Sequence, residues 1–206
     1  MGVLQKNAGG VTMYPVLIPQ GFKALRSKCS STHQQQFRRL LDQCQIYEKE
    51  ILPSIHPRKS ITYYGMAAAN LSLCYKLTGQ KRYLKEARRW IFTGVRYPHW
   101  GVVVKKDVDL SAAWLLFWYG ACYDWLRNDL SKEELDELRQ KLLLQGERMY
   151  QYAVENEPIS DAKAPQDVLT GGSWVTSYWQ NHNWIDFAGL AMAGYVLCDG
   201  RQQYRN

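Results

Sequence analysis

The sequence lacks the patterns that are typical of metal-binding, exported and membrane-spanning proteins. Its five cysteines are an odd number at wide spacings, without a Cys-x-x-Cys or Cys/His zinc pattern, so we expect no metal site and no cofactor. Residues 1–21 contain no charged segment that leads into an apolar one, so no secretion signal is visible. The apolar run at residues 184–197 is short for a membrane span, and we expect none.

Acidic residues are scarce relative to basic ones. The 19 Asp and Glu stand against 26 Lys and Arg, which gives a formal net charge of +7. Such an excess attracts polyanions, whether nucleic acids, acidic membranes or acidic polysaccharides. No nucleic-acid-binding motif is recognisable, so we expect no nucleic-acid partner. The densest basic cluster falls on one predicted helix, where a solvated face is the simpler interpretation: Lys81, Arg82, Lys85, Arg88 and Arg89.

Segments with the two-residue period of a β-strand are also missing, whereas helical periodicity is frequent. It predicts helices at residues 31–51, 60–77, 80–97, 109–127, 131–152 and 184–197. The clearest start is a capping box, in which Ser131 precedes Glu134 by three positions. Residues 1–30 have no helical period and are predicted to be an extended lead-in. We therefore expect one all-α domain of antiparallel helical hairpins, without the strict repeat of a solenoid.

Cysteine and aromatic side chains are present in numbers that favour a large apolar core. Cys44, Cys74 and Cys122 fall on apolar faces of predicted helices, so buried free thiols are the simpler interpretation, with a surface disulfide as the alternative. The eight Trp and fourteen Tyr either fill a helical core or line a groove in which flat sugar faces stack.

Three polar residues precede the last predicted helix, at the end of a long loop over residues 156–180: Asn181, His182 and Asn183. The first N–H groups of a helix are unpaired and its dipole is positive there, so a carboxylate binds favourably. Asn and His add side-chain donors. The alternative is structural, with Asn181 or Asn183 as the N-cap and His182 as a buried, hydrogen-bonded histidine.

Three stretches resemble the heparinase II/III-like polysaccharide lyases and their relatives, the alginate lyases and dermatan sulfate epimerases. They are YKLTGQKRYLKEARRW (75–90), AAWLLFWYGACYDWLRNDLSKEELDELRQKLL (112–143) and WQNHNWIDFAGLAMAG (179–194). The first two are typical of toroidal α/α carbohydrate enzymes. The third resembles the segment in which an Asn-His pair of the family binds the carboxylate of a uronic acid, and Asn181 and His182 match that pair.

This resemblance covers about residues 60–200 and has consequences for the fold. It implies that residues 31–206 form an incomplete (α/α) toroid, cut off in mid-architecture at its C-terminal end. It also implies an extracellular or periplasmic protein whose partner is an acidic, uronate-containing polysaccharide. An incomplete toroid leaves apolar helix faces uncovered, so we expect self-association.

The resemblance also implies a reaction. Removal of the uronate C5 proton places negative charge on the carboxylate, and donors from Asn181 and His182 would stabilise that charge. A base must take the proton, for β-elimination in a lyase or for epimerisation. The catalytic Tyr of the family lies beyond this segment, so Tyr178 is the nearby candidate for the base.

Two other functions stay open. One is a glycan-binding fragment without catalysis, in which sugar rings stack on exposed indoles; the candidates are Trp100, Trp174, Trp179 and Trp184, with Asn183 as a polar contact. The other is a glycoside hydrolase of the unsaturated glucuronyl hydrolase type, which needs a pair of carboxylates such as Asp124 and Asp186. A helix-packing hydrogen bond is the simpler role for Asp124.

Overall fold

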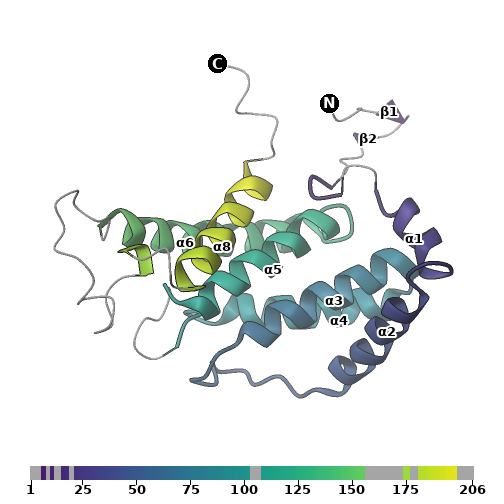
Figure 1. The fold of residues 1–206 in the computed structure, drawn as a ribbon, viewed down its shortest axis with the longest axis horizontal. Helices are drawn as coiled ribbons and strands as arrows, with labels where there is room; N and C mark the ends of the chain where they lie inside the picture. Colours follow the sequence, from purple (N-terminus) through teal and green to yellow (C-terminus); the bar gives the residue numbers. More distant parts are fainter. Residues whose placement is uncertain are drawn as a thin grey trace.

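The computed structural model describes residues 6–7, 10–11, 15–18, 21–102, 108–155, 174–176 and 181–198. Its helices are α1 (Lys23–Cys29), α2 (Gln34–Lys49), α3 (Thr62–Thr78), α4 (Lys81–Arg96), α5 (Leu110–Leu126), α6 (Lys132–Glu155) and α8 (Asn181–Leu197) (Figure 1). A 3-10 turn, η1 (Trp174–Thr176), and an antiparallel pair of two-residue strands, β1 (Lys6–Asn7) and β2 (Gly10–Val11), complete these elements. The prediction of an all-α fold is confirmed. Within the described ranges, no helix has both the length and the apolar character that a membrane crossing requires.

Helix α1 lies within the segment that was predicted to be extended, and this prediction is wrong for residues 23–29. The helix is stabilised by contacts with distant parts of the chain. Arg26 donates from Nε and Nη2 to the carbonyl oxygen of Lys76, at 2.9 and 2.8 Å, and the ring of Phe22 packs edge-on against Trp125. Local periodicity cannot reveal such support. The predicted capping box at α6 is confirmed, because Ser131 and Glu134 exchange two hydrogen bonds of 3.0 and 3.2 Å.

Helices α3, α5 and α8 form one layer and run in the same direction. Near their starts, the backbone N–H of Ile61 donates to Ser111 Oγ at 3.1 Å. Near their ends, Tyr75 Oη in the last turn of α3 donates to Asp129 Oδ1 just after α5, at 2.7 Å, so α3 and α5 are parallel. Gly189 of α8 lies against Ala113 of α5. Seven residues further along α5, Gly120 lies against Met192 and Val196, so α8 is parallel as well.

Helices α4 and α6 run in the opposite direction to this layer. Tyr64, at the start of α3, packs against Tyr97 at the end of α4, so consecutive helices form antiparallel hairpins. Arg88 of α4 pairs with Glu134 of α6 at 2.6 Å, and Lys141 Nζ donates to the carbonyl oxygen of Tyr97 at 2.6 Å. Helices α4 and α6 are therefore parallel to each other, and the hairpin α3–α4 lies beside the hairpin α5–α6.

The basic cluster on α4 is only partly a solvated face, because several of its members contact neighbouring helices. Arg89 donates to the backbone oxygens of Glu50 at 2.8 Å and Tyr47 at 3.0 Å, where α2 ends. The carbonyl oxygen of Tyr47 also accepts from the backbone N–H of Glu50 at 3.3 Å, and the guanidinium adds a further donor at this C-terminal end of α2. Arg82 forms a looser ion pair with Glu48 at 3.7 Å. The cluster thus connects α4 to α2 as well as to α6.

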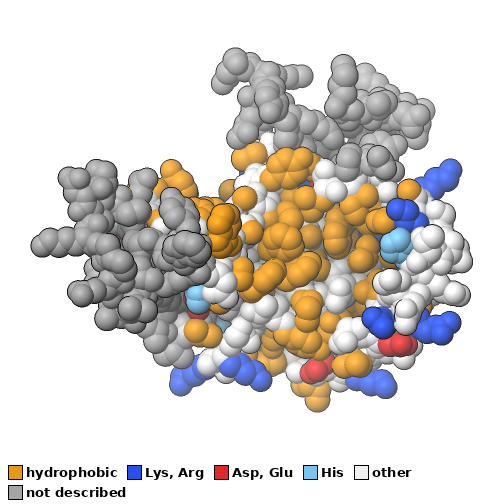
Figure 2. Space-filling view, viewed as in Figure 1, with side chains coloured by type: hydrophobic (Ala, Val, Ile, Leu, Met, Phe, Trp, Pro, Cys, Tyr) orange, Lys and Arg blue, Asp and Glu red, His pale blue; other side chains and the backbone are white. Residues whose placement is uncertain are grey.

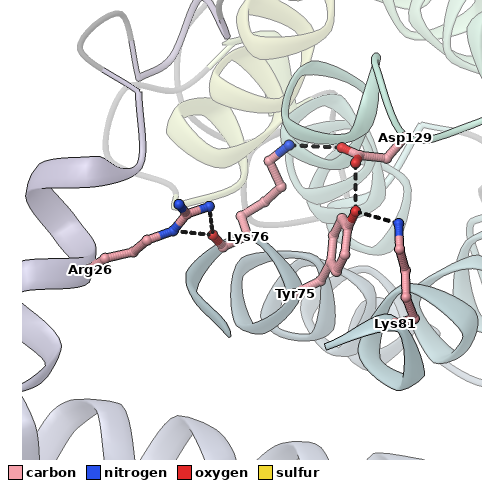
Figure 3. A network of polar contacts seen from close by, with 5 residues as sticks. All are labelled: Arg26, Tyr75, Lys76, Lys81 and Asp129. Atoms are coloured by element: carbon pink, nitrogen blue, oxygen red, sulfur yellow. Dashed lines mark hydrogen bonds and ion pairs between the residues drawn. The ribbon is translucent and has the colours of Figure 1, made fainter. Parts of the chain in front are cut away.

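A polar network joins the C-terminal end of α3 to the segments around it (Figure 3). Asp129, which follows α5, accepts from Tyr75 Oη and pairs with Lys76 Nζ, both at 2.7 Å. Lys81 Nζ, in the first turn of α4, donates to Tyr75 Oη at 3.2 Å. The carbonyl oxygen of Lys76 is the group that accepts from Arg26. Four parts of the chain are held together here by side chains that satisfy each other's hydrogen-bonding groups.

The core is rich in aromatic side chains, as the composition predicted. Those that are almost fully buried include Tyr47, Tyr83, Trp90, Tyr97, Trp100 and Tyr119. Cys44, Cys74 and Cys122 are buried free thiols, which confirms the prediction. The hydroxyl of Tyr119 donates to the carbonyl oxygen of Trp90, and Gly94 leaves room for it, since a Cβ atom at Gly94 would overlap that hydroxyl.

The close contact between α5 and α8 predicts opposite effects of alanine at two glycines of α8. A Cβ atom at Gly189 would overlap the backbone of Ala113, which cannot move aside as a side chain can. We expect Gly189→Ala to lower the free energy of unfolding by about 3 kcal/mol. No atom lies within 4 Å of a Cβ atom at Gly194, so Gly194→Ala should raise it by about 0.5–1 kcal/mol through helix propensity. Urea denaturation measures both, and equal effects would contradict the α5–α8 contact.

Candidate functional site

The starts of α3, α5 and α8 meet at one end of the helical layer, which we call the loop end. The connections at this end are long, spanning residues 50–61, 97–109 and 156–180, whereas those at the opposite end span only residues 79–80 and 127–131. Long connections often carry functional residues. Three helix N-termini, each with a partial positive charge, also gather at the loop end. Three of the four histidines lie there: His56, His99 and His182.

Asp109 organises the start of α5 at the loop end. Its Oδ1 accepts from the backbone N–H groups of Ser111 at 2.9 Å and Ala112 at 3.2 Å, which is N-cap geometry. Its Oδ2 accepts from the backbone N–H of Val102 at 2.8 Å. Because Ser111 Oγ also accepts from Ile61 N, this single turn links the starts of α3 and α5.

Asn181 and His182 occupy the first turn of α8, and the two side chains contact each other. Asn181 is exposed and His182 is half-buried, with 3.0 Å between Asn181 Oδ1 and His182 Nδ1. Since the amide oxygen can only accept, Nδ1 carries the hydrogen and Nε2 is left to interact with a ligand. Trp184 lies in the same turn with 66% of its surface exposed, so its indole ring is accessible. This hydrogen-bonded pair with an open indole is the candidate site.

Asn183 was predicted to contact the substrate, and the structure contradicts this. The residue is only 4% exposed, and its Nδ2 donates to the carbonyl oxygen of Trp174 at 3.1 Å. Asn183 points away from solvent because the helical repeat turns it towards η1, while Asn181, two residues earlier, faces outward. Its amide anchors the 3-10 turn to α8.

Trp100 and Trp174 were predicted to stack on sugars, and their burial shows that this is wrong. Trp100 is 0% exposed, donates from Nε1 to the carbonyl oxygen of Gly94 at 2.9 Å and packs edge-on against Tyr119. Trp174 is 2% exposed, donates to the carbonyl oxygen of Val108 at 2.9 Å and stacks on Tyr152. Neither ring has a face left for a ligand. Tyr178 and Trp179 lie outside the described residues.

Asp124 has a structural role, as the simpler interpretation predicted. It is fully buried near the end of α5, where its carboxylate accepts from the backbone N–H groups of Val16 at 2.7 Å and Leu17 at 3.0 Å. Arg127 Nη2 donates to the same carboxylate at 3.0 Å. Asp186 is also fully buried, but it lies in the second turn of α8, near the loop end. Since α5 and α8 are parallel, these two carboxylates lie towards opposite ends and do not form a hydrolase pair.

Two histidines that the sequence reasoning did not single out contact each other at the loop end. The ring centroids of His56 and His99 are 4.3 Å apart, and His56 is buried. His56 Nδ1 accepts from the backbone N–H of Arg58 at 3.1 Å, and His99 Nδ1 donates to the carbonyl oxygen of Gly101 at 3.1 Å. Each adjoins a proline in a long connection, and this was the signal in the sequence. No group of three or more metal-ligating side chains occurs in the part of the chain that the structure describes.

Two tyrosines at this end, Tyr63 and Tyr97, are poor candidates for a base. Burial raises the pKa of Tyr63 to about 12, and the charges of Tyr47 and Glu50 act in the same direction. Burial also raises the pKa of Tyr97 well above its ordinary value, and its hydroxyl donates to the carbonyl oxygen of Pro53 at 2.6 Å. A tyrosine that accepts a proton at neutral pH needs a pKa that is lowered, not raised, from its ordinary value.

No family model matches the chain, and no curated protein matches it.

The first turn of α8 predicts that its two asparagines differ in their contribution to stability. Asn183→Ala removes the donor to the carbonyl oxygen of Trp174 and leaves that group without this partner, so we expect a loss of about 2 kcal/mol in the free energy of unfolding. Asn181→Ala, at an exposed position of the same turn, should change it by no more than about 0.5 kcal/mol. Urea denaturation of both variants checks this, and the reverse order would contradict the assigned roles.

Proposed function

We propose that this chain is a domain of the uronate lyase and epimerase class, built on part of an (α/α) toroid, and that it binds an acidic polysaccharide at the start of α8. The observation that carries the proposal is the hydrogen-bonded pair of Asn181 and His182, open to solvent at a helix N-terminus, with the exposed ring of Trp184 beside it. The two layers of antiparallel hairpins support the toroid.

The chemistry of the pair fits a uronate carboxylate. The first N–H groups of α8 are free of helical partners and are directed at an incoming anion. The amide Nδ2 of Asn181 donates to one carboxylate oxygen, and Nε2 of His182 donates when the imidazole is protonated. The indole of Trp184 presents an apolar face to the sugar ring. The excess of positive charge attracts the polyanion over a longer distance.

In the catalytic form of the proposal, the same donors stabilise the charge that develops on the carboxylate when the C5 proton leaves. The proton then passes to a base, for which we propose Tyr178. A lyase expels the O4 substituent and forms a double bond, whereas an epimerase returns a proton to the other face of C5.

Replacing His182 tests the binding site. His182→Ala should weaken the binding of alginate or heparan sulfate about tenfold, because a hydrogen bond to a charged group is lost. The matched control is His33→Ala, which removes an exposed histidine at the start of α2. Calorimetric titration at moderate salt measures both affinities. Equal affinity of the two variants and the unmodified chain would refute the proposed site.

The reaction is tested separately on the same glycans. Ultraviolet absorbance detects the unsaturated uronate of a lyase, and deuterium incorporation at C5 in heavy water detects an epimerase. Either signal should vanish in Tyr178→Phe and in His182→Ala. Binding without either signal would restrict the function to glycan recognition.

We also propose that the chain self-associates through helix faces that remain uncovered in the incomplete toroid. After Asn181, the exposed positions of α8 are apolar: Trp184, Phe187, Ala188, Ala191, Gly194 and Tyr195. Hydrophobic side chains gather on the face that carries α5 and α8 (Figure 2). A helix that is apolar on all sides is normally buried.

This surface predicts a concentration-dependent mass that a single charge should reduce. Ala191→Glu places a carboxylate in the middle of the outward face of α8 without removing a buried contact. We expect sedimentation equilibrium to give a larger mass for the unmodified chain than for this variant. A monomer at every concentration of the unmodified chain would contradict self-association.

A further inference from the structure

Two of the buried cysteines face each other across the contact between α2 and α3. These helices run in opposite directions, and Asn70 Nδ2 of α3 donates to Tyr47 Oη of α2 at 3.1 Å, which fixes their register. One turn back along α2 from Tyr47 is Cys44, and one turn forward along α3 from Asn70 is Cys74. In antiparallel helices these two steps lead to the same level of the contact, so the two thiols are neighbours.

Burial supports this placement. Cys44 and Tyr47 are the buried residues of α2, and Leu40 and Leu41 of the same helix are partly buried against the core, so Cys44 lies on the inner face of α2. Cys44 and Cys74 are both 0% exposed and belong to the same apolar cluster. The inward direction of Cys44 therefore leads to α3, where Cys74 is the facing sulfur.

The surroundings of the pair make the two thiols chemically unequal. The Cys44 thiol donates a hydrogen bond to the Cys74 sulfur, which lowers the pKa of Cys74 and raises that of Cys44. The Tyr83 hydroxyl and the Arg82 guanidinium lower the pKa of Cys74 further. Arg82 Nη2 in turn donates to Tyr83 Oη at 2.6 Å. Cys74 is therefore the better nucleophile of the two.

Helix α2 contributes few buried residues to its contact with α3. Of its sixteen residues, only Cys44 and Tyr47 are buried, and the helix lies at the edge of the helical layers (Figure 1). Elements with few buried contacts open locally without global unfolding. Such an opening would admit a small oxidant to the sulfurs.

We propose that Cys44 and Cys74 are a redox-active dithiol, which a low-molecular-weight disulfide oxidises to a covalent link between α2 and α3. The Cys74 thiolate attacks one sulfur of glutathione disulfide, a mixed disulfide forms and one glutathione thiolate leaves. Cys44 then loses its proton and attacks the Cys74 sulfur, which releases the second glutathione. Two electrons and two protons pass from the cysteines to the two glutathione thiols.

The link would change the behaviour of α2. It closes a loop that begins in α2 and includes the whole connection to α3. Closing such a loop restricts the unfolded chain, so the oxidised protein should unfold at a higher temperature, by roughly 5–10 °C. The edge helix would become a fixed part of the bundle.

The test uses the full chain in which the more accessible thiols are removed by Cys29→Ser and Cys198→Ser. This protein is equilibrated in buffers with increasing ratios of oxidised to reduced glutathione. It is then denatured, its remaining free thiols are alkylated with iodoacetamide, and it is digested. We expect mass spectrometry to find a Cys44–Cys74 linked peptide, two hydrogens lighter than the reduced pair, together with the rise in Tm. Cys122, a fully buried thiol whose partner is Ser72, is the internal control and should remain reduced.

Two single variants test the order of attack. In Cys44→Ser the mixed disulfide of Cys74 cannot be resolved, so a glutathione adduct should accumulate on Cys74. Cys74→Ser should form an adduct on Cys44 more slowly. Full alkylation of Cys44 and Cys74 in the most oxidising buffer would refute the proposed disulfide. Faster adduct formation on Cys44 than on Cys74 would refute the assignment of Cys74 as the attacking thiol.

Discussion

The structure depends on the need to cover most of the surface of α5. This helix contains a single charged residue, Asp124, which is itself buried, and apolar side chains surround the rest of its circumference. Helices α3 and α8 therefore lie along its two flanks, with α6 also in contact. Gly65 and Gly189 permit these approaches, since a side chain at either position would press against α5. The hydrophobic effect favours burial of the apolar surface of α5, and the two glycines determine how closely α3 and α8 can approach it.

The shared direction of α3, α5 and α8 is what creates the loop end. Antiparallel hairpins placed side by side bring every second helix into the same orientation, so three N-termini and the three long connections meet. An anion-binding site is favoured at such an end for electrostatic reasons alone. Only three side chains in the first turn of α8 would make such a site selective for a uronate: the amide of Asn181, the imidazole of His182 and the indole of Trp184.

The polar side chains fall into two groups: those that hydrogen-bond to the backbone of the fold, and those that remain able to bind a ligand. Asp109, Asp124 and Asn183 each accept from or donate to backbone groups of another segment or of a helix start. In this way they hold the start of α5, the segment at residues 16–17 and η1. Arg26 and Arg89 do the same for the carbonyl ends of α3 and α2. A polar residue engaged in this way is not free to bind a glycan. Asn181 and His182 differ, because among the described residues their side chains hydrogen-bond to each other and to no backbone group.

The sequence by itself determined the helices and the all-α class, because periodicity and capping are properties of neighbouring residues, as the box at Ser131 illustrates. It also located the polar turn at the start of α8. Only the tertiary structure decided which residues of that region face a ligand: Trp184 is open, whereas Trp100, Trp174 and Asn183 are enclosed. Likewise α1 exists through its contacts with α3 and Trp125. Burial depends on segments far away in the chain, and no local pattern contains that information.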